Sequence, residues 1–347
     1  MSSNTTTMTR RTFTSTAGAA AAAALTTGIA NYQAHADEAP QLDESSPIPP
    51  VAVPDSWDEE ADVIVAGTGG GLCAALRAAE LGGRVICLDP SYTWGGTSIE
   101  TDIFAVFGSK YQERLWEVVD LAEFGMPGVT LADMFDQSMG GHSAEFFKEV
   151  FYQRYYAQAG GNLDMASGQT GDGTINPMGS PSRGSASHVR ALLECEADMT
   201  DWLAEKIAPY GVTLAPVTMY GTSGIMFLCP AGSETGGFVA RANYTIYEAL
   251  YNACVDSGVK FELGNGVAAL VADGQGAVVG VKTDEGTFIK ANRGVILATG
   301  GMAGNQQMLA KYCPSIFYGA FTSTATPFDT GLGIRMGQGV GGIIILP

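Results

Sequence analysis

The sequence predicts an α/β fold in which a domain built on a parallel sheet and a β-meander is interrupted by a mostly helical cap domain. A strand, a glycine-rich turn, a helix and a second strand follow one another over residues 61–90. Apolar residues then recur at helical spacing through the middle of the chain, and short β-rich runs return from residue 259. Because the sheet pattern stops and later resumes, we expect one domain over 57–108 and 259–347, with 109–258 inserted as a cap.

The first unit reads ADVIVAGTGGGLCAALRAAELGGRVICLDP. Its apolar run at 63–65 is typical of a buried parallel strand. Alanine and leucine over 72–81 predict a helix that ends at the glycine pair 82–83, because glycine readily adopts the backbone conformation that follows a helix. Residues 85–88 form the second β-rich run, and Asp89 follows it.

The middle of the chain predicts helices at 111–124, 143–159 and 189–207, from the spacing of their apolar residues. Between the last two lies a Gly/Ser-rich segment, 160–187. A segment of this length and composition is either a lid or poorly ordered, and the sequence leaves both open.

Five short runs in the last third predict strands. They are VKFEL, AALVAD, VVGVKT, GTFIKA and GVILATGG, which begin at residues 259, 268, 278, 286 and 294. Turn residues at 273–276 and 284–286 separate three of them. We therefore expect a β-meander that leads into a further parallel strand.

Composition limits the function classes. A content of 46% hydrophobic and 16% charged residues supports a sizeable core. The net charge of −18 disfavours nucleic acid and anionic membranes as partners, and no stretch approaches the roughly 20 apolar residues of a membrane span. The six cysteines and three histidines form no C-x-x-C or metal-ligand pattern, so we expect mostly buried thiols and no metal, haem or iron–sulfur site.

The N-terminus predicts export. Residues 1–36 carry Arg10 and Arg11 in TRRTF, then an Ala-rich apolar segment, then the A-x-A cleavage pattern at 34–36. These parts, in this order, resemble a twin-arginine (Tat) signal peptide, which directs a protein to the periplasm or the exterior of the cell envelope. The Pro-rich residues 37–56 are expected to form a linker.

The glycine turn has the chemistry of a dinucleotide site. Glycines let the backbone approach a pyrophosphate, while the next helix directs its free N–H groups at it. Gly67 and Gly69 begin a G-x-G-x-x-G spacing, but Leu72 stands at the sixth position and Gly71 comes one residue early. Asp89, at the end of the second strand, is placed for ribose hydroxyls. A tight glycine turn in an unrelated α/β protein is the alternative.

Companion motifs carry a family resemblance. They are the entry WDEEADVIVAG, WGGTS at 94–98, the meander through GVILATGG, YCP at 312–314 and TGLGIRMGQGVGG at 330–342. Over about 57–346 the chain resembles the FAD-binding family of fumarate reductase and succinate dehydrogenase flavoproteins, which includes urocanate reductase-like and 3-ketosteroid dehydrogenase-like enzymes. The resemblance implies a Rossmann-like FAD-binding domain and an oxidoreductase that transfers hydride between flavin N5 and an activated C–C double bond.

The resemblance also implies which residues contact FAD. It places the pyrophosphate against Gly67, Gly69, Gly70 and Gly71, and the adenosine ribose against Asp89. It places the phosphate and flavin side against Gly95, Gly96, Thr97 and Ser98. Adenine meets Val267, and the cofactor is lined by Ala298, Thr299, Gly300 and Gly301. The chain departs from the family at Leu72, at Asp102-Ile103, where the family has Gly-Gly, and at Leu332, where it commonly has Asp.

The family's catalytic residues follow the TG-x-G element, so we expect them beyond Pro347 and leave them unassigned, with the FAD domain incomplete at its C-terminus. The partners implied are a small unsaturated acid as substrate and an electron-donor protein. Two alternatives stay open: a truncated, non-catalytic FAD-binding fragment, and a 3-ketosteroid dehydrogenase-like flavoenzyme.

Overall fold

The computed structural model describes residues 43–101, 104–105, 109–111, 186–216, 227–232, 242–317 and 326–344. The chain divides into two units, 1–44 and 45–347, and the fold below is that of the second. The expected signal segment, the expected helices at 111–124 and 143–159 apart from Tyr111, and nearly all of the Gly/Ser-rich segment lie outside the described residues.

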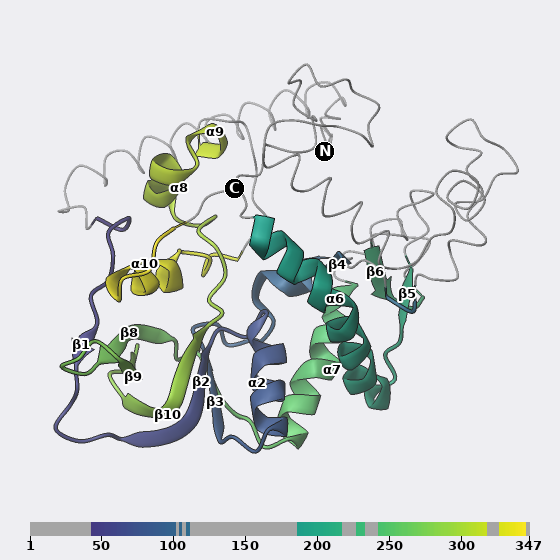
Figure 1. The fold of residues 1–347 in the computed structure, drawn as a ribbon, viewed down its shortest axis with the longest axis horizontal. Helices are drawn as coiled ribbons and strands as arrows, with labels where there is room; N and C mark the ends of the chain where they lie inside the picture. Colours follow the sequence, from purple (N-terminus) through teal and green to yellow (C-terminus); the bar gives the residue numbers. More distant parts are fainter. Residues whose placement is uncertain are drawn as a thin grey trace, which may run out of the picture. The chain divides into compact units, whose positions relative to one another are not determined.

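One large sheet of seven strands organises the unit, in the order β1-β8-β9-β10-β2-β3-β7 (Figure 1). The strands are β1 (Val51–Ala52), β2 (Glu59–Ala66), β3 (Val85–Asp89), β7 (Lys260–Leu263), β8 (Val267–Ala272), β9 (Val278–Thr283) and β10 (Phe288–Leu297). Strands β10, β2, β3 and β7 run parallel, β1 runs parallel to β8, and β8, β9 and β10 form the antiparallel meander. The predicted α/β fold, with a mostly parallel sheet and a meander, is confirmed.

Strand β2 lies between β10 and β3, and this position decides where the site forms. All five residues of β3 are buried, and β2 is buried from Ile64 to Ala66, as expected for strands covered on both faces. At their carboxyl ends the three strands stay bonded: Gly67 N donates to the Leu88 carbonyl at 2.7 Å, and Ala298 N donates to the Ala66 carbonyl at 2.7 Å. The turns that follow β2, β3 and β10 therefore meet at one edge of the sheet.

Two predictions about the sheet need correction, one of a linker and one of two separate strands. The expected linker 37–56 contributes β1, whose two residues pair with Val271 and Ala272 of β8. The two runs that begin at residues 286 and 294 form one strand, β10, with an irregularity between Ala291 and Gly294. A bulge of this kind takes up extra residues without ending the strand, so β10 pairs with β9 at its start and with β2 along its length.

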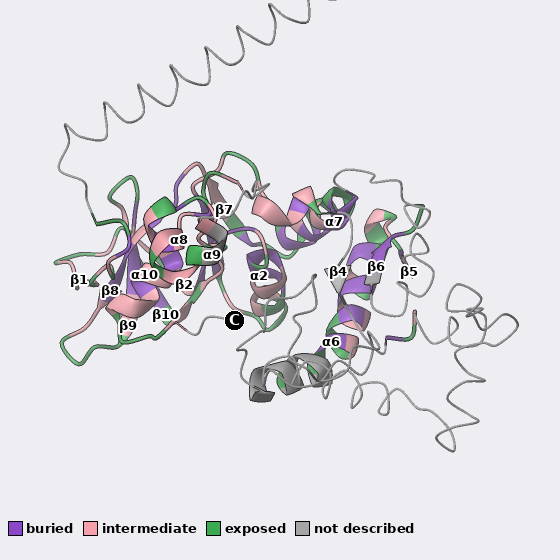
Figure 2. Ribbon diagram, turned by 90° about the horizontal axis from the view of Figure 1, so that it is seen from above, coloured by how far each residue is buried: buried purple, intermediate pink, exposed green. Residues whose placement is uncertain are grey.

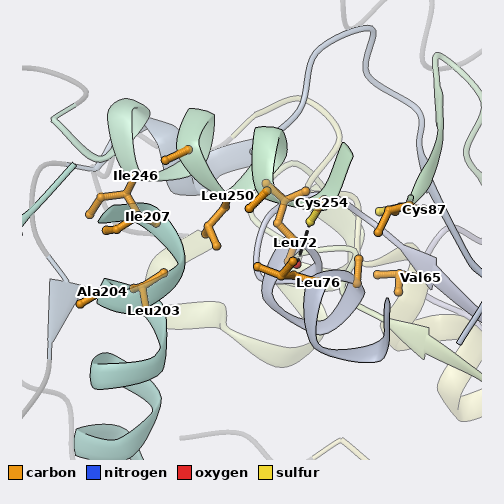
Figure 3. Close-up of a cluster of buried hydrophobic side chains, with 14 of the residues drawn as sticks. Val65, Leu72, Leu76, Cys87, Leu203, Ala204, Ile207, Ile246, Leu250 and Cys254 are labelled. Carbon is orange, nitrogen blue, oxygen red and sulfur yellow. Dashed lines mark hydrogen bonds between the residues drawn. The ribbon is translucent and has the colours of Figure 1, made fainter. Parts of the chain in front are cut away.

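Three helices share a core on one face of the sheet. Helix α2 (Gly71–Glu80) lies beside α7 (Asn243–Asp256), and α7 lies beside α6 (Ala186–Ile207), and all three carry buried residues (Figures 1 and 2). Figure 3 shows side chains of this cluster: Val65, Leu72, Leu76, Cys87, Leu203, Ala204, Ile207, Ile246, Leu250 and Cys254. Helix α7, which the sequence assigned to the cap, thus packs on the helix of the glycine unit, and the domain boundaries themselves stay a prediction.

The opposite face carries a second core. Alternate strand residues, including Ile64, Ile86 and Leu88, pack with Met336 of α10 (Leu332–Gly339). The remaining helices are α8 (Gln306–Tyr312), α9 (Pro314–Phe317) and the short 3-10 helices η1 (Gly96–Glu100) and η3 (Ala208–Tyr210). A second sheet has three strands in the order β4 (Phe104–Ala105), β6 (Phe227–Pro230) and β5 (Leu214–Pro216). The sequence pattern did not show this small sheet, because its strands are two to four residues long.

The six cysteines are all described and are free thiols. Burial raises the pKa of Cys73 to about 11 and that of Cys254 to about 12, so both stay protonated at neutral pH. Cys195 differs from the expectation of a buried thiol, because it is exposed on α6. Within the described part of the chain there is no group of three potential metal ligands, and no helix is long and apolar enough to cross a membrane.

Candidate functional site

A cavity of about 510 Å³ lies at the carboxyl ends of β2, β3 and β10. Twelve of the fourteen residues assigned to the cofactor line it: Gly67, Gly69, Gly70, Asp89, Gly96, Thr97, Ser98, Val267, Ala298, Thr299, Gly300 and Gly301. The other two, Gly71 and Gly95, lie directly beside lining residues but do not line the cavity themselves. The structure therefore brings together residues that are more than two hundred positions apart in the sequence.

Gly67 makes the turn after β2 possible. Its φ is +100°, a conformation that side chains other than glycine rarely adopt, and a Cβ there would collide with the carbonyl oxygen of Ala298. The close approach of this backbone to the end of β10 thus requires glycine.

Gly71 replaces the missing third glycine. A Cβ at this position would lie 2.9 Å from Cγ1 of Val65 and 3.2 Å from Cβ of Ala298. Close packing of the helix on the strands is the task of the third glycine in the usual motif, and here it is moved one residue toward the N-terminus. Leu72, which stands at the usual position, is fully buried in the core shared by α2 and α7. The departure at Leu72 therefore leaves the turn intact.

The N-terminus of α2 can receive an anion. The helix begins at Gly71, no side chain caps it, and its first turn carries no acidic residue. The preceding Gly69 and Gly70 line the cavity, and a Cβ at Gly70 would meet nothing within 4 Å. Free N–H groups and the positive end of the helix dipole favour a phosphate at such a place.

Asp89 is held by three hydrogen bonds from its own chain. Its Oδ2 accepts from Thr68 N at 2.8 Å and from Thr68 Oγ1 at 2.6 Å, and its Oδ1 accepts from Ser91 N at 2.9 Å. The side chain is 6% exposed and lines the cavity. The acid expected to face the ribose therefore also fixes the glycine turn.

The 3-10 helix η1 is tied to a segment that the sequence analysis did not assign to the site. Thr97 Oγ1 donates to Oδ2 of Asp329 at 2.6 Å and accepts from Thr326 N at 3.1 Å. A Cβ at Gly300, whose φ is +78°, would collide with the other oxygen of Asp329. Thr326, Pro327, Phe328, Asp329 and Leu332 all line the cavity. The signal available in the sequence was the position of Asp329 directly before the TGLG motif.

The cavity is acidic at its described walls. Asp89, Glu100 and Asp329 line it, and no Lys, Arg or His does so among the residues that the structure describes. A pyrophosphate bound here would rely on backbone N–H groups and the α2 N-terminus rather than on cationic side chains.

Replacing Asp329 with alanine removes the acceptor of the Thr97 hydroxyl. Because a hydrogen bond to a charged group contributes about 1.5–3 kcal/mol, we expect a fall of at least about tenfold in the affinity for a dinucleotide such as FAD, measured by fluorescence titration. Asp329→Asn, whose carbonyl can still accept from Thr97, should lose less. Asp58→Ala is the control, since Asp58 accepts from Phe288 N at 2.9 Å outside the cavity. Equal losses in Asp329→Ala and Asp58→Ala would contradict the role of Asp329.

A sequence model of the family described as FAD binding domain matches residues 156–345, more than half of the 347 residues. The chain belongs to the FAD binding domain family. FAD is therefore the cofactor that the cavity should hold. The match begins after the glycine turn and Asp89, so it does not rest on these two features.

Relatives of this FAD binding domain chain include a urocanate reductase of Eggerthella lenta, 29% identical over 272 residues that cover 76% of this chain and 35% of the relative. This chain is also similar to a fumarate reductase (cytochrome) of Shewanella frigidimarina, to which it is 24% identical over 287 residues that cover 82% of this chain and 40% of the relative. The chain spans 25–40% of the length of the curated relatives it matches.

Among solved structures, the chain is similar to the 3-ketosteroid-Δ4-(5α)-dehydrogenase from Rhodococcus jostii RHA1 in complex with 4-androstene-3,17-dione. The TM-score is 0.58 at 22% identity, over 85% of this chain and 57% of the dehydrogenase. The likeness shows a shared fold.

The described residues fit FAD. The glycine turn offers a surface without side chains, α2 offers an uncapped N-terminus, and Asp89 offers a carboxylate at the end of the second strand. These are the features that the pyrophosphate and the ribose of the adenosine half require.

Proposed function

We propose that this protein is an exported, FAD-dependent oxidoreductase that acts on the activated C–C double bond of a small unsaturated acid. The observation that carries the proposal is the cavity at the ends of β2, β3 and β10, where the glycine turn, Asp89 and the α2 N-terminus converge in a chain of the FAD binding domain family. The similarity to a urocanate reductase and to a fumarate reductase supports reduction of an unsaturated acid.

In this proposal FAD supplies hydride exchange at its N5 atom, and the chain's own residues bind and orient it. Gly67, Gly69 and Gly70 receive the pyrophosphate, and Asp89 accepts from the ribose. Thr97 and Ser98 belong to η1 and line the cavity on the side where the flavin is expected. No residue is assigned to proton transfer or to binding of the substrate.

Export is proposed from the sequence alone. The twin arginines, the Ala-rich segment and the A-x-A pattern within 1–36 support transport by the twin-arginine route, which carries folded proteins with their cofactor. The corresponding test fuses residues 1–36 to a reporter and follows its export in cells with and without the Tat translocase. Export that persists without the translocase would contradict this route.

The purified chain is expected to bind FAD non-covalently, because its motifs contact phosphates and ribose and no histidine lies near 95–101 for covalent attachment. Titration with FAD should quench flavin fluorescence, and acid precipitation should leave the flavin in the supernatant. Flavin in the pellet would contradict non-covalent binding, and no binding at all would contradict the cofactor assignment.

Anaerobic reoxidation separates the candidate activities. Reoxidation of the reduced FAD protein by fumarate or urocanate, monitored by the return of flavin absorbance, would support the proposed activity. Reoxidation by an unsaturated 3-ketosteroid such as 4-androstene-3,17-dione alone, which is a dehydrogenation run in reverse, would favour a steroid dehydrogenase, the activity of the structural relative. A reduced protein that none of these compounds reoxidises would contradict the proposed substrates and leave FAD binding standing.

A further inference from the structure

The Thr68 side chain connects the turn after β2 with the end of β3 and with the backbone at Gly95, at the edge of the cavity. Thr68 follows β2, is fully buried, and lies between the first two glycines of the turn. Its Oγ1 accepts from Gly95 N at 2.9 Å and donates to Asp89 Oδ2 at 2.6 Å. Because the backbone N–H of Gly95 can only donate and a carboxylate only accept, the direction of both hydrogen bonds is fixed.

The bonds of Thr68 leave one oxygen of Asp89 with acceptor capacity. A carboxylate oxygen accepts about two hydrogen bonds. Oδ2 of Asp89 already accepts two, both from Thr68, whereas Oδ1 accepts one, from Ser91 N. A hydroxyl group on a ligand therefore has its place at Oδ1.

We propose that Thr68 is a positioning residue for the adenosine half of the cofactor, an inference that rests on the proposed function. Its hydroxyl turns Oδ1 of Asp89 toward the ribose and fixes the distance between the glycine turn and the backbone at Gly95. Gly95 has φ +94° and directly precedes η1, whose first residues line the cavity. One hydroxyl group thus fixes the position of the ribose acceptor and the position of the Gly95 backbone, from which η1 begins.

Valine tests this role because it has the shape of threonine without the hydroxyl. In Thr68→Val, Gly95 N loses its acceptor and Asp89 Oδ2 loses one of two donors, whereas Thr68→Ser keeps both bonds. Thr200→Val is the matched control. Thr200 is also fully buried, and its hydroxyl donates to the Glu196 carbonyl at 2.7 Å within α6, away from the cavity.

The experiment measures the dissociation constants of FAD and of ADP for the four proteins by titration, with the melting temperature of the cofactor-free forms. ADP carries the ribose and pyrophosphate but no flavin, so it reports the adenosine half alone. We expect Thr68→Val to weaken FAD and ADP by similar factors of about tenfold or more. Thr68→Ser should restore both affinities, and Thr200→Val should bind as the wild type does. If the valine variant does not fold, Thr68→Ala carries the same expectation.

Three outcomes would overturn the proposal. Wild-type affinity of Thr68→Val for ADP would show that the hydroxyl does not act on the adenosine half. Weak binding by Thr68→Ser would show that the methyl group, rather than the hydroxyl, matters. Failure of the wild-type protein to bind either FAD or ADP would overturn the cofactor assignment together with this proposal. Normal wild-type binding with unchanged affinity in the valine variant would overturn this proposal alone.

Discussion

Replacing Gly67 with alanine is expected to abolish FAD binding and to lower the melting temperature of the protein. A left-handed backbone conformation costs an L-residue about 1–2 kcal/mol, and Gly67 has φ +100°. The added Cβ would also collide with the Ala298 carbonyl. Ala298 cannot move away without breaking its own bond to the Ala66 carbonyl, which closes the ladder between β2 and β10. The alanine variant therefore has to distort the turn that faces the cavity.

Gly82→Ala is the matched control for backbone strain. Gly82 has φ +82° at the end of α2, but a Cβ there would meet nothing within 4 Å. This variant should lose stability through strain alone and keep its affinity for FAD. Titration and thermal unfolding of both variants separate the two effects, and equal FAD affinity in Gly67→Ala and the wild type would show that the turn does not contact the cofactor.

Gly70→Ala keeps the test valid if Gly67→Ala does not fold. Gly70 has φ −55°, which alanine adopts freely, and its Cβ would enter open space beside the cavity. We expect the melting temperature of the cofactor-free protein to stay near that of the wild type while FAD affinity falls, because the methyl group takes up space at the helix N-terminus. A fall in stability with unchanged FAD affinity would contradict this placement of the pyrophosphate.

Replacing Asp89 with alanine has the second large expected effect. The change removes the proposed acceptor for the ribose and the acceptor for three donors of the chain, Thr68 N, Thr68 Oγ1 and Ser91 N. Loss of a charge-assisted hydrogen bond costs about 1.5–3 kcal/mol, a factor of roughly 10–150 in the dissociation constant of FAD. The loss should exceed that of Thr68→Val, because the alanine variant removes the ribose contact as well as the support of the turn.

Asp273→Ala is the control for Asp89→Ala. Oδ1 of Asp273 accepts from Gln275 N and Ala277 N in the turn between β8 and β9, outside the cavity. This variant should lose stability without loss of FAD affinity. FAD affinity that stays unchanged in Asp89→Ala would place the ribose partner elsewhere in the chain.

The sequence by itself determined the elements whose signals are local. The turn at Gly67–Gly71, α2, the acid at the end of β3 and the meander could each be read from fewer than about forty consecutive residues, because burial, helix periodicity and turn chemistry are set by near neighbours. The structure places twelve of the fourteen residues assigned to the cofactor on one cavity.

The tertiary structure decided what depends on which strands are neighbours. Thr97 and Asp329 are 232 positions apart, and no spacing rule connects them until β10 lies beside β2. Gly71 could be recognised as the packing glycine only once Val65 and Ala298 lay against it. The direction of the Thr68 hydroxyl likewise required Asp89 and Gly95 to be in place. Periodicity and turn chemistry show which segments form, but a contact between distant residues exists only after the sheet has set the order of its strands.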